Sequence, residues 1–269
     1  MGAGPAGLSC AHRLATLGHD VVIYEAQEKS GGLNEYGLAA YKMAGDYAQK
    51  EVENILSIGG ISIKHGTQVG KDVSFAELQT NHDAVFMGVG LGTSKDIQLD
   101  GEDASGVLNA VDYIHQLRQA KDLGQLPVGQ DVVVIGGGMT AIDIAIQIKR
   151  LGAANVTMAY RRGKEHMNAS IEEQEFALNE GVHIAHWAKP VSLQIEQGTI
   201  TGVEFKKANI EGNETYITPT DMLFKAIGQS LTPINMGTTE FVKTSGKYDV
   251  DKELRTSQLG IWAGGDCVA

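Results

Sequence analysis

One unit of sequence occurs twice in this chain of 269 residues. Residues 2–7 (GAGPAG) lead into an apolar stretch with helical spacing, which is followed by Gly18 and the run DVVIYE. The pattern returns at residues 131–162 as DVVVI, GGGMTA, IDIAIQIKRLG and NVTMAYRR. Strand, glycine-rich turn, helix and second strand are typical of a dinucleotide-binding βαβ unit. Because the turn, the helix and the second strand are repeated, the sequence predicts an α/β protein with two nested Rossmann-like dinucleotide-binding domains.

Charge and cysteine content narrow the class of protein. The chain has 22 Lys and Arg against 33 Asp and Glu, a formal charge of −11. Nucleic acids and anionic membranes attract positive surfaces, so we expect neither as a partner. Cys10 and Cys267 lie far apart and form no CxxC motif, which fits a reducing compartment. With no signal peptide or membrane span in the sequence, we expect a cytoplasmic protein.

Glycines define the chemistry of the first turn. Gly2 would allow the tight turn, Gly4 the close approach of a pyrophosphate, and Gly7 the packing of the helix on the sheet. The N-terminus of that helix offers unpaired N–H groups and a partial positive charge to phosphate. The candidate phosphate contacts of this turn are Gly2, Gly4, Pro5, Ala6 and Gly7.

A carboxylate follows the first turn at the end of the next strand. Glu25 stands where an acid accepts hydrogen bonds from the 2′ and 3′ hydroxyls of a ribose. The other interpretation is a solvated acid at a strand end, and the preceding turn favours the ribose role.

The second turn differs from the first at the position that should read the ribose. Its candidate contacts are Gly136, Gly138, Met139, Thr140 and Ala141, with alanine replacing the third glycine. The following strand ends in Tyr160, Arg161 and Arg162, with no carboxylate. Because a guanidinium binds phosphate bidentately, this arginine pair favours a ribose 2′-phosphate and hence NADP, although surface charges that bind nothing remain an alternative. The choice between NADH and NADPH stays open.

Four further stretches carry a family resemblance. They are EKSGGLNEYGLAAYKM, DAVFMGVGLG, DMLFKAIGQ and LRTSQLGIWAGGDCVA, and with the two turns they extend over nearly the whole chain. In this combination the sequence resembles the flavoprotein reductases that contain two dinucleotide-binding domains.

The resemblance implies FAD in the first module and NAD(P)H in the second. It implies an FAD domain formed by residues 1–108 and 233–269, with an NAD(P) domain at 109–232 inserted between them. Lys42, in the loop expected near the flavin ring, would stabilise the reduced flavin, or else is an ordinary exposed lysine. The FAD contacts implied are Gly32, Leu33, Lys42, Gly88, Gly90, Gly265 and Asp266, and the NAD(P) contacts are Ala226 and Gly228. No catalytic acid–base pair and no metal site are expected.

Within these reductases the chain is most similar to one subgroup. It contains the small subunit of glutamate synthase and the flavin subunit of bacterial NAD(P)-dependent dihydropyrimidine dehydrogenase, and NEYGLAAYKM and GVGLG favour the latter. The resemblance implies that electrons leave through 4Fe-4S clusters, in a preceding domain or a partner, towards a partner subunit that carries the substrate site. Met139 and Asn168 depart from the usual pattern of the subgroup.

Two alternatives to this function remain. The chain could be a stand-alone NAD(P)H:acceptor flavin reductase. Only Met1 precedes the first turn, and the chain stops after GGDCVA, so we expect a chain truncated at both ends. In that case it could also be a nucleotide-binding fragment that does not retain FAD.

Overall fold

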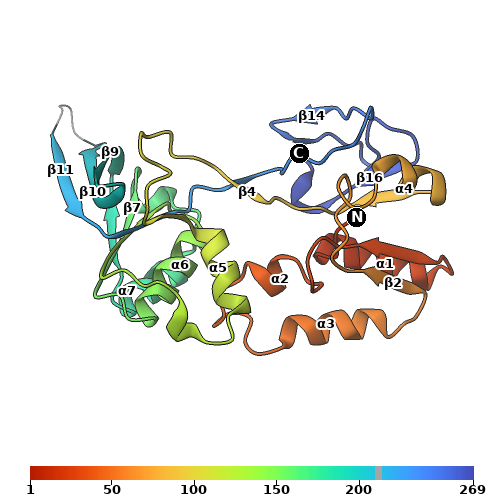
Figure 1. Ribbon diagram of the computed structural model, residues 1–269, viewed down its shortest axis with the longest axis horizontal. Helices are drawn as coiled ribbons and strands as arrows, with labels where there is room; N and C mark the ends of the chain where they lie inside the picture. The colour runs from red at the N-terminus through yellow and green to blue at the C-terminus, as the bar shows by residue number, and fades with distance from the viewer. Residues whose placement is uncertain (210–213) are drawn as a thin grey trace. The chain divides into compact units, whose positions relative to one another are not determined.

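The computed structural model describes residues 1–209 and 214–269, which form two compact units (Figure 1). Unit 1 contains residues 1–93 and 229–269, and unit 2 contains residues 94–228. The sequence pattern places the first boundary at 108/109, whereas the fold places it at 93/94. The difference arises because residues after 93 lead directly into β5 (Val107–Asn109), which pairs with β12 (Met222–Lys225) inside unit 2. The chain passes between the units at β4 (Thr93–Ser94) and β13 (Gln229–Ser230), which pair with each other.

Unit 2 is built on a five-stranded parallel sheet. The strand order is β5-β12-β6-β7-β8, with β6 at Asp131–Ile135, β7 at Asn155–Tyr160 and β8 at His183–His186. The apolar strands β6 and β12 lie at its centre and are buried on both faces, as expected for a parallel sheet covered on two sides.

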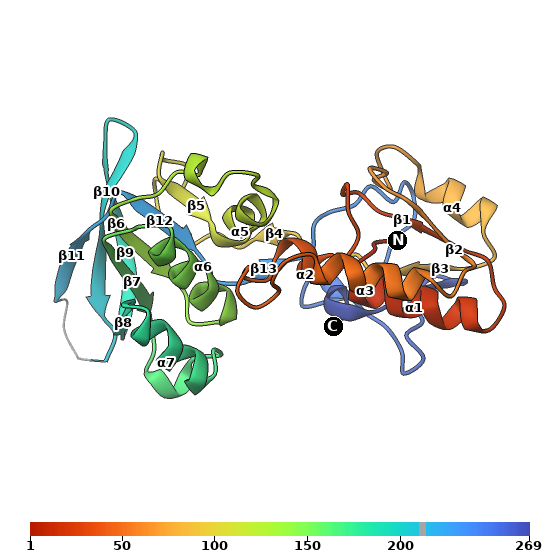
Figure 2. The same ribbon diagram turned by 90° about the horizontal axis from the view of Figure 1, so that it is seen from below.

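Helices cover one face of this sheet and a second sheet covers the other (Figure 2). On the helical face are α5 (Ala110–Gln119) and α6 (Met139–Arg150), and the rings of Tyr113 and Phe224 meet there at 5.0 Å. The opposite face packs against an antiparallel sheet through Val203 and Phe205. That sheet consists of β9 (Ala188–Glu196), β10 (Thr199–Lys207) and β11 (Thr215–Pro219). The remaining elements of unit 2 are η1 (Leu123–Gln125), η2 (Lys164–His166) and α7 (Ile171–Asn179).

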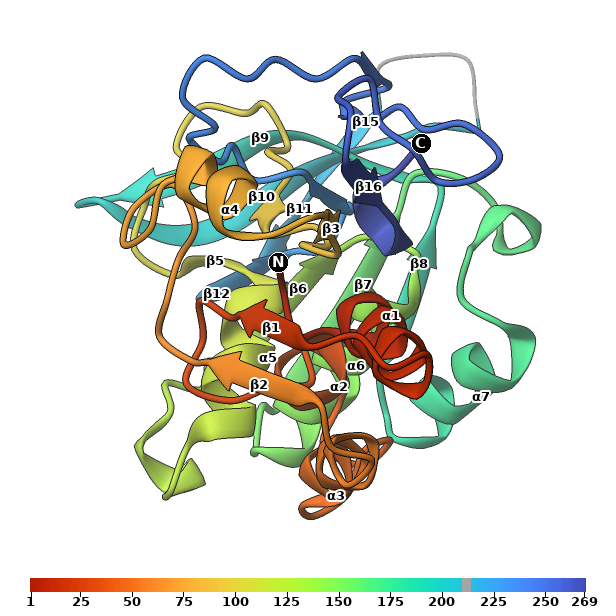
Figure 3. The ribbon, with the colours of Figure 1, turned by 90° about the vertical axis from the view of Figure 1, so that its right-hand side faces the viewer.

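Unit 1 repeats this strand order in shorter form. β1 (Val21–Tyr24) pairs in parallel with β2 (Ile61–Lys64), and β3 (Val85–Met87) with β16 (Ile261–Ala263) (Figure 3). Met1 and Gly2 lie between the pairs, since Gly2 N–H donates to the carbonyl of Tyr24 at 2.9 Å and Gly88 N–H to that of Met1 at 2.9 Å. The order β16, β3, residues 1–2, β1, β2 therefore corresponds to β5-β12-β6-β7-β8. The prediction of two Rossmann-like domains is confirmed.

Helix α1 (Pro5–Thr16) positions the first turn by burying one face. Leu8 and Ala11 pack with Ile23 of β1 and Val52 of α3 (Tyr47–Leu56). Gly18, with φ +88°, follows the end of this helix, in the left-handed region that favours glycine. The other elements of unit 1 are α2 (Leu33–Tyr36), α4 (Phe75–Asn81), β14 (Lys243–Thr244), β15 (Lys247–Tyr248) and η3 (Gly265–Cys267). No helix in the described part of the chain is long and apolar enough to span a membrane.

Candidate functional site

The two glycine turns begin with the same hydrogen bond. Gly2 N–H donates to the Tyr24 carbonyl at 2.9 Å, and Gly136 N–H donates to the Ala159 carbonyl at 3.0 Å. Each bond ties the turn to the end of the neighbouring strand, β1 in unit 1 and β7 in unit 2. The residues that follow these two carbonyls therefore occupy matching positions in the two units.

Both turns start with a glycine that nothing larger can replace. A Cβ on Gly2 would lie 2.5 Å from the carbonyl oxygen of Gly88, and a Cβ on Gly136 would overlap the carbonyl oxygen of Ala226. Both glycines also have positive φ, +84° and +152°. The structure thus brings the predicted residues Gly88 and Ala226 against the two turns.

The third position of the motif is more crowded in unit 1. A Cβ on Gly7 would overlap the carbonyl oxygen of Gly2, so the close packing of α1 on the turn requires glycine. In unit 2 the same position holds Ala141, which is fully buried at the start of α6. The two turns therefore differ in how closely helix and turn approach.

The helices that follow the turns have unsatisfied N-termini. α1 and α6 begin after Gly4 and Gly138 with no side-chain cap, whereas Ser74 and Ser170 cap α4 and α7. A Cβ on Gly138 would meet nothing within 4 Å, and one on Gly4 would meet only the Cα of Gly32, at 3.7 Å. Both helix ends thus present free N–H groups beside open space, which suits a phosphate.

A loop returns to each turn after the second strand. Gly31 N–H donates to the Ala3 carbonyl at 2.8 Å, and Ala169 N–H donates to the Gly137 carbonyl at 3.2 Å. Neither donor was among the predicted contacts. The paired glycines at 31–32 were a signal for the first; nothing in the sequence distinguishes Ala169.

The matching positions at the ends of β1 and β7 hold different side chains. The carboxylate of Glu25, whose side chain is buried, accepts hydrogen bonds from Ala3 N–H at 2.6 Å and from Gln27 N–H at 2.8 Å. The remaining lone pairs of the carboxylate stay available to hydroxyl groups. In unit 2 the ring of Tyr160 lies against Gly137, where an added Cβ would overlap it. A hydrogen-bond acceptor lies beside the first turn, and an aromatic ring lies at the matching place beside the second turn.

The arginine pair follows Tyr160 on an exposed loop. The Tyr160 hydroxyl donates to the His166 carbonyl at 2.5 Å, and Trp187 N–H donates to the Arg162 carbonyl at 3.1 Å. Arg161 and Arg162 are both exposed, and neither forms an ion pair with a residue that the structure describes. Two unneutralised guanidinium groups therefore lie next to the second turn.

The predicted FAD contacts near the C-terminus also reach the first turn. Gly265 has φ +78°, and a Cβ there would lie 2.8 Å from the Cβ of Ala6 in the first turn of α1. Asp266 is the next residue and is exposed. The structure brings Gly265 against Ala6, although the two residues are far apart in the sequence.

Other predicted residues lie at the helix starts or in the loops that follow the strands and α2. Leu33, 39% exposed, is the first residue of α2, directly after Gly32. Met139, 44% exposed, is the first residue of α6, and Thr140 follows it half-buried. Gly90 and Gly228 have φ +63° and +105° in the segments after β3 and β12. The ammonium of Lys42 lies 5.8 Å from the ring centroid of Tyr41, on an exposed loop after α2.

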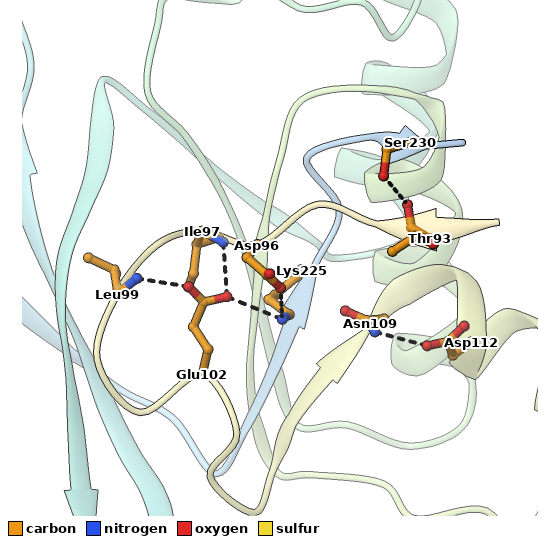
Figure 4. A network of polar contacts seen from close by, with 9 residues as sticks. All are labelled: Thr93, Asp96, Ile97, Leu99, Glu102, Asn109, Asp112, Lys225 and Ser230. Atoms are coloured by element: carbon orange, nitrogen blue, oxygen red, sulfur yellow. Dashed lines mark hydrogen bonds and ion pairs between the residues drawn. The ribbon is translucent and has the colours of Figure 1, made fainter. Parts of the chain in front are cut away.

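A buried lysine at the end of β12 was not predicted. Lys225 is 8% exposed, and its ammonium donates to Asp96 Oδ1 at 3.1 Å and to Glu102 Oε2 at 3.2 Å (Figure 4). Glu102 also accepts the N–H groups of Ile97 and Leu99 at 2.9 and 2.8 Å. Burial lowers the pKa of Lys225, but the two carboxylates outweigh it and raise the pKa above its usual value. A lysine inside the apolar strand MLFK was the available signal.

His, Cys, Asp and Glu side chains do not gather into a metal-binding group within residues 1–209 and 214–269. His183 and His186 stand at the two ends of β8, one exposed and one half-buried.

Comparison with models of known protein families shows to which family the chain belongs. The model described as "Pyridine nucleotide-disulphide oxidoreductase" matches residues 1–269. The chain belongs to this family. Membership supports the use of FAD and NAD(P) and an NAD(P)H-dependent flavoprotein oxidoreductase chemistry, in agreement with the two turns.

Several oxidoreductases are similar in sequence to this chain over its whole length. "Putative oxidoreductase AegA" of Escherichia coli is 36% identical, and the match covers 100% of the chain and 45% of that protein. "Glutamate synthase [NADPH] small chain" of E. coli is 33% identical, with 100% and 62% covered. "NAD-dependent dihydropyrimidine dehydrogenase subunit PreT homolog" of Salmonella typhi is 32% identical, with 100% and 62% covered. Both subgroup names expected from the sequence occur among these relatives, and the chain spans 45% to 62% of their lengths.

Solved structures of the oxidoreductase family share the fold. Thioredoxin reductase of T. acidophilum has a TM-score of 0.75 at 20% identity, with 100% of this chain and 88% of that chain covered. Mycobacterium tuberculosis FprA in complex with NADPH has a TM-score of 0.76 at 17% identity, with 98% and 77% covered. At these identities the likeness concerns the fold alone.

Proposed function

We propose that unit 1 binds FAD, that unit 2 binds NAD(P)H, and that the chain takes hydride from NAD(P)H and passes the electrons to a partner. One observation carries the proposal: two equivalent turns end in different ribose-reading groups, Glu25 in unit 1 and Tyr160 with an arginine pair in unit 2. Duplicated sites for one nucleotide would not need this difference. The flavin, when bound, supplies the two-electron chemistry, and the protein supplies binding, orientation and charge.

Unit 1 has groups that suit the ribose and the phosphates of FAD. The free N–H groups at the start of α1 suit the pyrophosphate, and Glu25, already fixed by Ala3 N–H, suits the ribose diol. Asp266 directly follows Gly265, which packs on Ala6 at the same helix start. We assign Asp266 to the ribityl or pyrophosphate end of FAD. Lys42 remains our candidate for stabilising reduced flavin.

Unit 2 offers NADPH the corresponding contacts. The start of α6 would receive the pyrophosphate, with Gly138 leaving the approach open. Arg161 and Arg162 would receive the 2′-phosphate, as unpaired cations that bind phosphate bidentately. Ala226 and Gly228, at the carboxyl end of β12, would line the path towards the nicotinamide, because ligands of open α/β sheets bind at the strand ends.

The finer proposal is a dihydropyrimidine dehydrogenase-like role. The alignment with the PreT homolog spans 272 positions, close to the 269 residues of the chain, whereas that with the E. coli glutamate synthase small chain spans 300. An alignment with few insertions favours the first relationship. The role of a glutamate synthase small subunit is the second candidate, supported by a similar identity of 33%.

The reduced flavin should pass its electrons to an acceptor that lies outside the two described units. Cys10 and Cys267 are both free thiols, and burial raises the pKa of the Cys267 thiol, whose S–H donates to the carbonyl of Gly264 at 3.2 Å. These two thiols do not resemble a disulfide redox pair. Several relatives carry the words "subunit" or "small chain" in their names. We therefore propose a partner subunit as the acceptor, reached through 4Fe-4S clusters in a preceding domain or in that partner.

The test is flavin retention followed by reduction. The purified chain should take up one FAD, and NADPH should bleach its absorbance in the absence of oxygen. Arg161→Ala should slow bleaching by NADPH more than bleaching by NADH. FAD binding without bleaching by either donor would contradict the reductase proposal. Absence of FAD binding would favour the alternative of a nucleotide-binding fragment, and rapid turnover with soluble acceptors would favour a stand-alone reductase.

A further inference from the structure

Residues 161–166, here named the basic loop, are held at fixed points beside the second turn. The Tyr160 hydroxyl binds the His166 carbonyl at 2.5 Å at one end of the loop, and Trp187 N–H binds the Arg162 carbonyl at 3.1 Å near the other. Ala169 then returns the chain to the Gly137 carbonyl. These contacts hold the backbone of the loop beside the second turn.

The basic loop contains three cations and one acid. Arg161, Arg162 and Lys164 are exposed, and none of them forms an ion pair with a described residue. The acid is Glu165, whose Oε1 lies 2.9 Å from Nδ1 of His166. The acid is therefore paired with the histidine rather than with a cation, which leaves all three cations available to a phosphate.

The carboxylate of Glu165 is folded back into the loop. A Cβ on Gly163 would lie 2.6 Å from Glu165 Oε2 and 2.7 Å from the ring of Trp187, so both side chains flank this glycine. A hydrogen bond from its own N–H, followed by the charge of His166, holds the pKa of Glu165 below its usual value. A negative charge therefore lies in the same loop as the three cations.

We propose that Glu165 is a specificity-determining residue that limits the preference of unit 2 for a ribose 2′-phosphate over a free ribose diol. The inference rests on the proposed NAD(P)H site in unit 2 and extends it. A 2′-phosphate carries close to two negative charges, and Glu165 would repel it from the same loop whose cations attract it. His166 moderates this repulsion by pairing with the carboxylate.

Removal of Glu165 and removal of His166 should change the affinity for a 2′-phosphate in opposite directions. Without the charge of Glu165, the three cations attract the 2′-phosphate unopposed. Without His166, the carboxylate is free to turn towards Arg162 or Lys164 and neutralise it. The two substitutions should therefore shift 2′-phosphate affinity in opposite directions, whereas a loop with only a structural role would respond in the same direction to both.

The test measures binding of two small probes, 2′,5′-ADP and 5′-ADP, to the full chain by titration calorimetry. Glu165→Gln should tighten 2′,5′-ADP binding by about three- to tenfold at low salt and leave 5′-ADP unchanged. His166→Gln should weaken 2′,5′-ADP binding by about threefold. In the double variant the effect of the histidine substitution should vanish, because its partner charge is gone.

Glu175→Gln is the matched control, since it removes the same charge from an exposed position on α7 outside the basic loop. It should leave both affinities unchanged. Equal tightening by Glu165→Gln and Glu175→Gln, or no change in either, would overturn the assignment of Glu165 while the nucleotide site stands. Failure of the unmodified chain to bind either probe would overturn the NAD(P)H site of unit 2, and this inference with it.

Discussion

The two glycine turns of this chain share a backbone and differ in what surrounds it. In both, the first glycine donates to the end of the neighbouring strand, and a returning loop donates to the second carbonyl of the turn. What differs is the residue at the strand end. Glu25 accepts a hydrogen bond from the first turn with its carboxylate, and the ring of Tyr160 packs against the second turn. We infer that the shared backbone would bind phosphate in both units, while the residue at one strand end would select the ribose.

Gly7→Ala tests the largest difference between the turns. The added methyl group would overlap the carbonyl oxygen of Gly2, so we expect unit 1 to lose about 3 kcal/mol of stability, as overpacked sites do. Ala141→Gly, at the matching site, should cost about 1 kcal/mol through helix propensity alone. Each unit contains one of the two tryptophans, Trp262 or Trp187, so denaturation of single-tryptophan variants reports each unit separately. Equal losses at the two sites would refute the difference in packing.

Lys225 tests a second contrast. It directly precedes Ala226, as the fully buried Met87 precedes Gly88. Lys225→Met places in unit 2 the residue type that unit 1 has at Met87, but it leaves Glu102 without its cation. We therefore expect the free energy of unfolding of unit 2 to fall by about 2 kcal/mol. In a Glu102→Gln background the same substitution should cost less, because the stranded charge is absent. Urea denaturation followed by Trp187 fluorescence measures the loss of stability caused by Lys225→Met in each background. Equal losses in the two backgrounds would show that the ion pair with Glu102 contributes nothing.

Glu25→Gln tests the ribose-reading position of unit 1. The amide keeps an acceptor for Ala3 N–H but loses the charge-assisted bonds to a diol, so FAD affinity should fall by about tenfold or more. Equilibrium dialysis with FAD and with riboflavin separates this effect from a general loss of binding, because riboflavin lacks the adenosine ribose. An equal fall for both ligands would place Glu25 in a structural role only.

Tyr160→Phe tests the matching position of unit 2 and should have a smaller effect. The ring and its contact with Gly137 remain, while the hydrogen bond to the His166 carbonyl is lost. We expect unit 2 to lose about 1 kcal/mol, the net contribution of one hydrogen bond. Trp187 fluorescence during denaturation checks this value. No change in stability would mean that the basic loop is held by its other contacts.

The smallest expected effect concerns pH. Burial, followed by the charge of Lys164, lowers the pKa of His186 below its usual value. The unfolded chain then takes up the proton first, so the stability of unit 2 should fall as pH drops below about 6.5. His186→Gln should flatten that decline in a comparison of denaturation curves at pH 7 and pH 5. If stability falls as much in His186→Gln as in the unmodified chain, titratable groups other than His186 cause the fall.

The repeat made most of the fold predictable from sequence. Apolar periodicity and glycine placement located α1, β1, β6, α6 and β7, because a buried strand, a tight turn and an amphipathic helix each leave a local pattern. The first domain boundary could not be found in this way. Residues 94–108 belong to unit 2 through β5 pairing and the ion pairs of Lys225, which are non-local contacts.

The candidate site was predictable in its glycines but not in its supporting contacts. Gly2 and Gly136 follow from backbone geometry that only glycine adopts. The bonds from Ala169 to Gly137 and from His166 to Glu165 depend on how a loop folds back, which no periodicity encodes. The roles assigned to Glu25, Lys42 and the arginine pair stay predictions.

A crossed binding experiment tests the central claim, that the two turns serve different dinucleotides. FAD and 2′,5′-ADP are titrated separately into the full chain, its Glu25→Gln variant and its Arg162→Ala variant. We predict that Glu25→Gln weakens FAD binding by about tenfold and leaves 2′,5′-ADP unchanged. Arg162→Ala should weaken 2′,5′-ADP by a similar factor and leave FAD unchanged. A loss of both ligands in either variant, or of the opposite ligand, would contradict the claim.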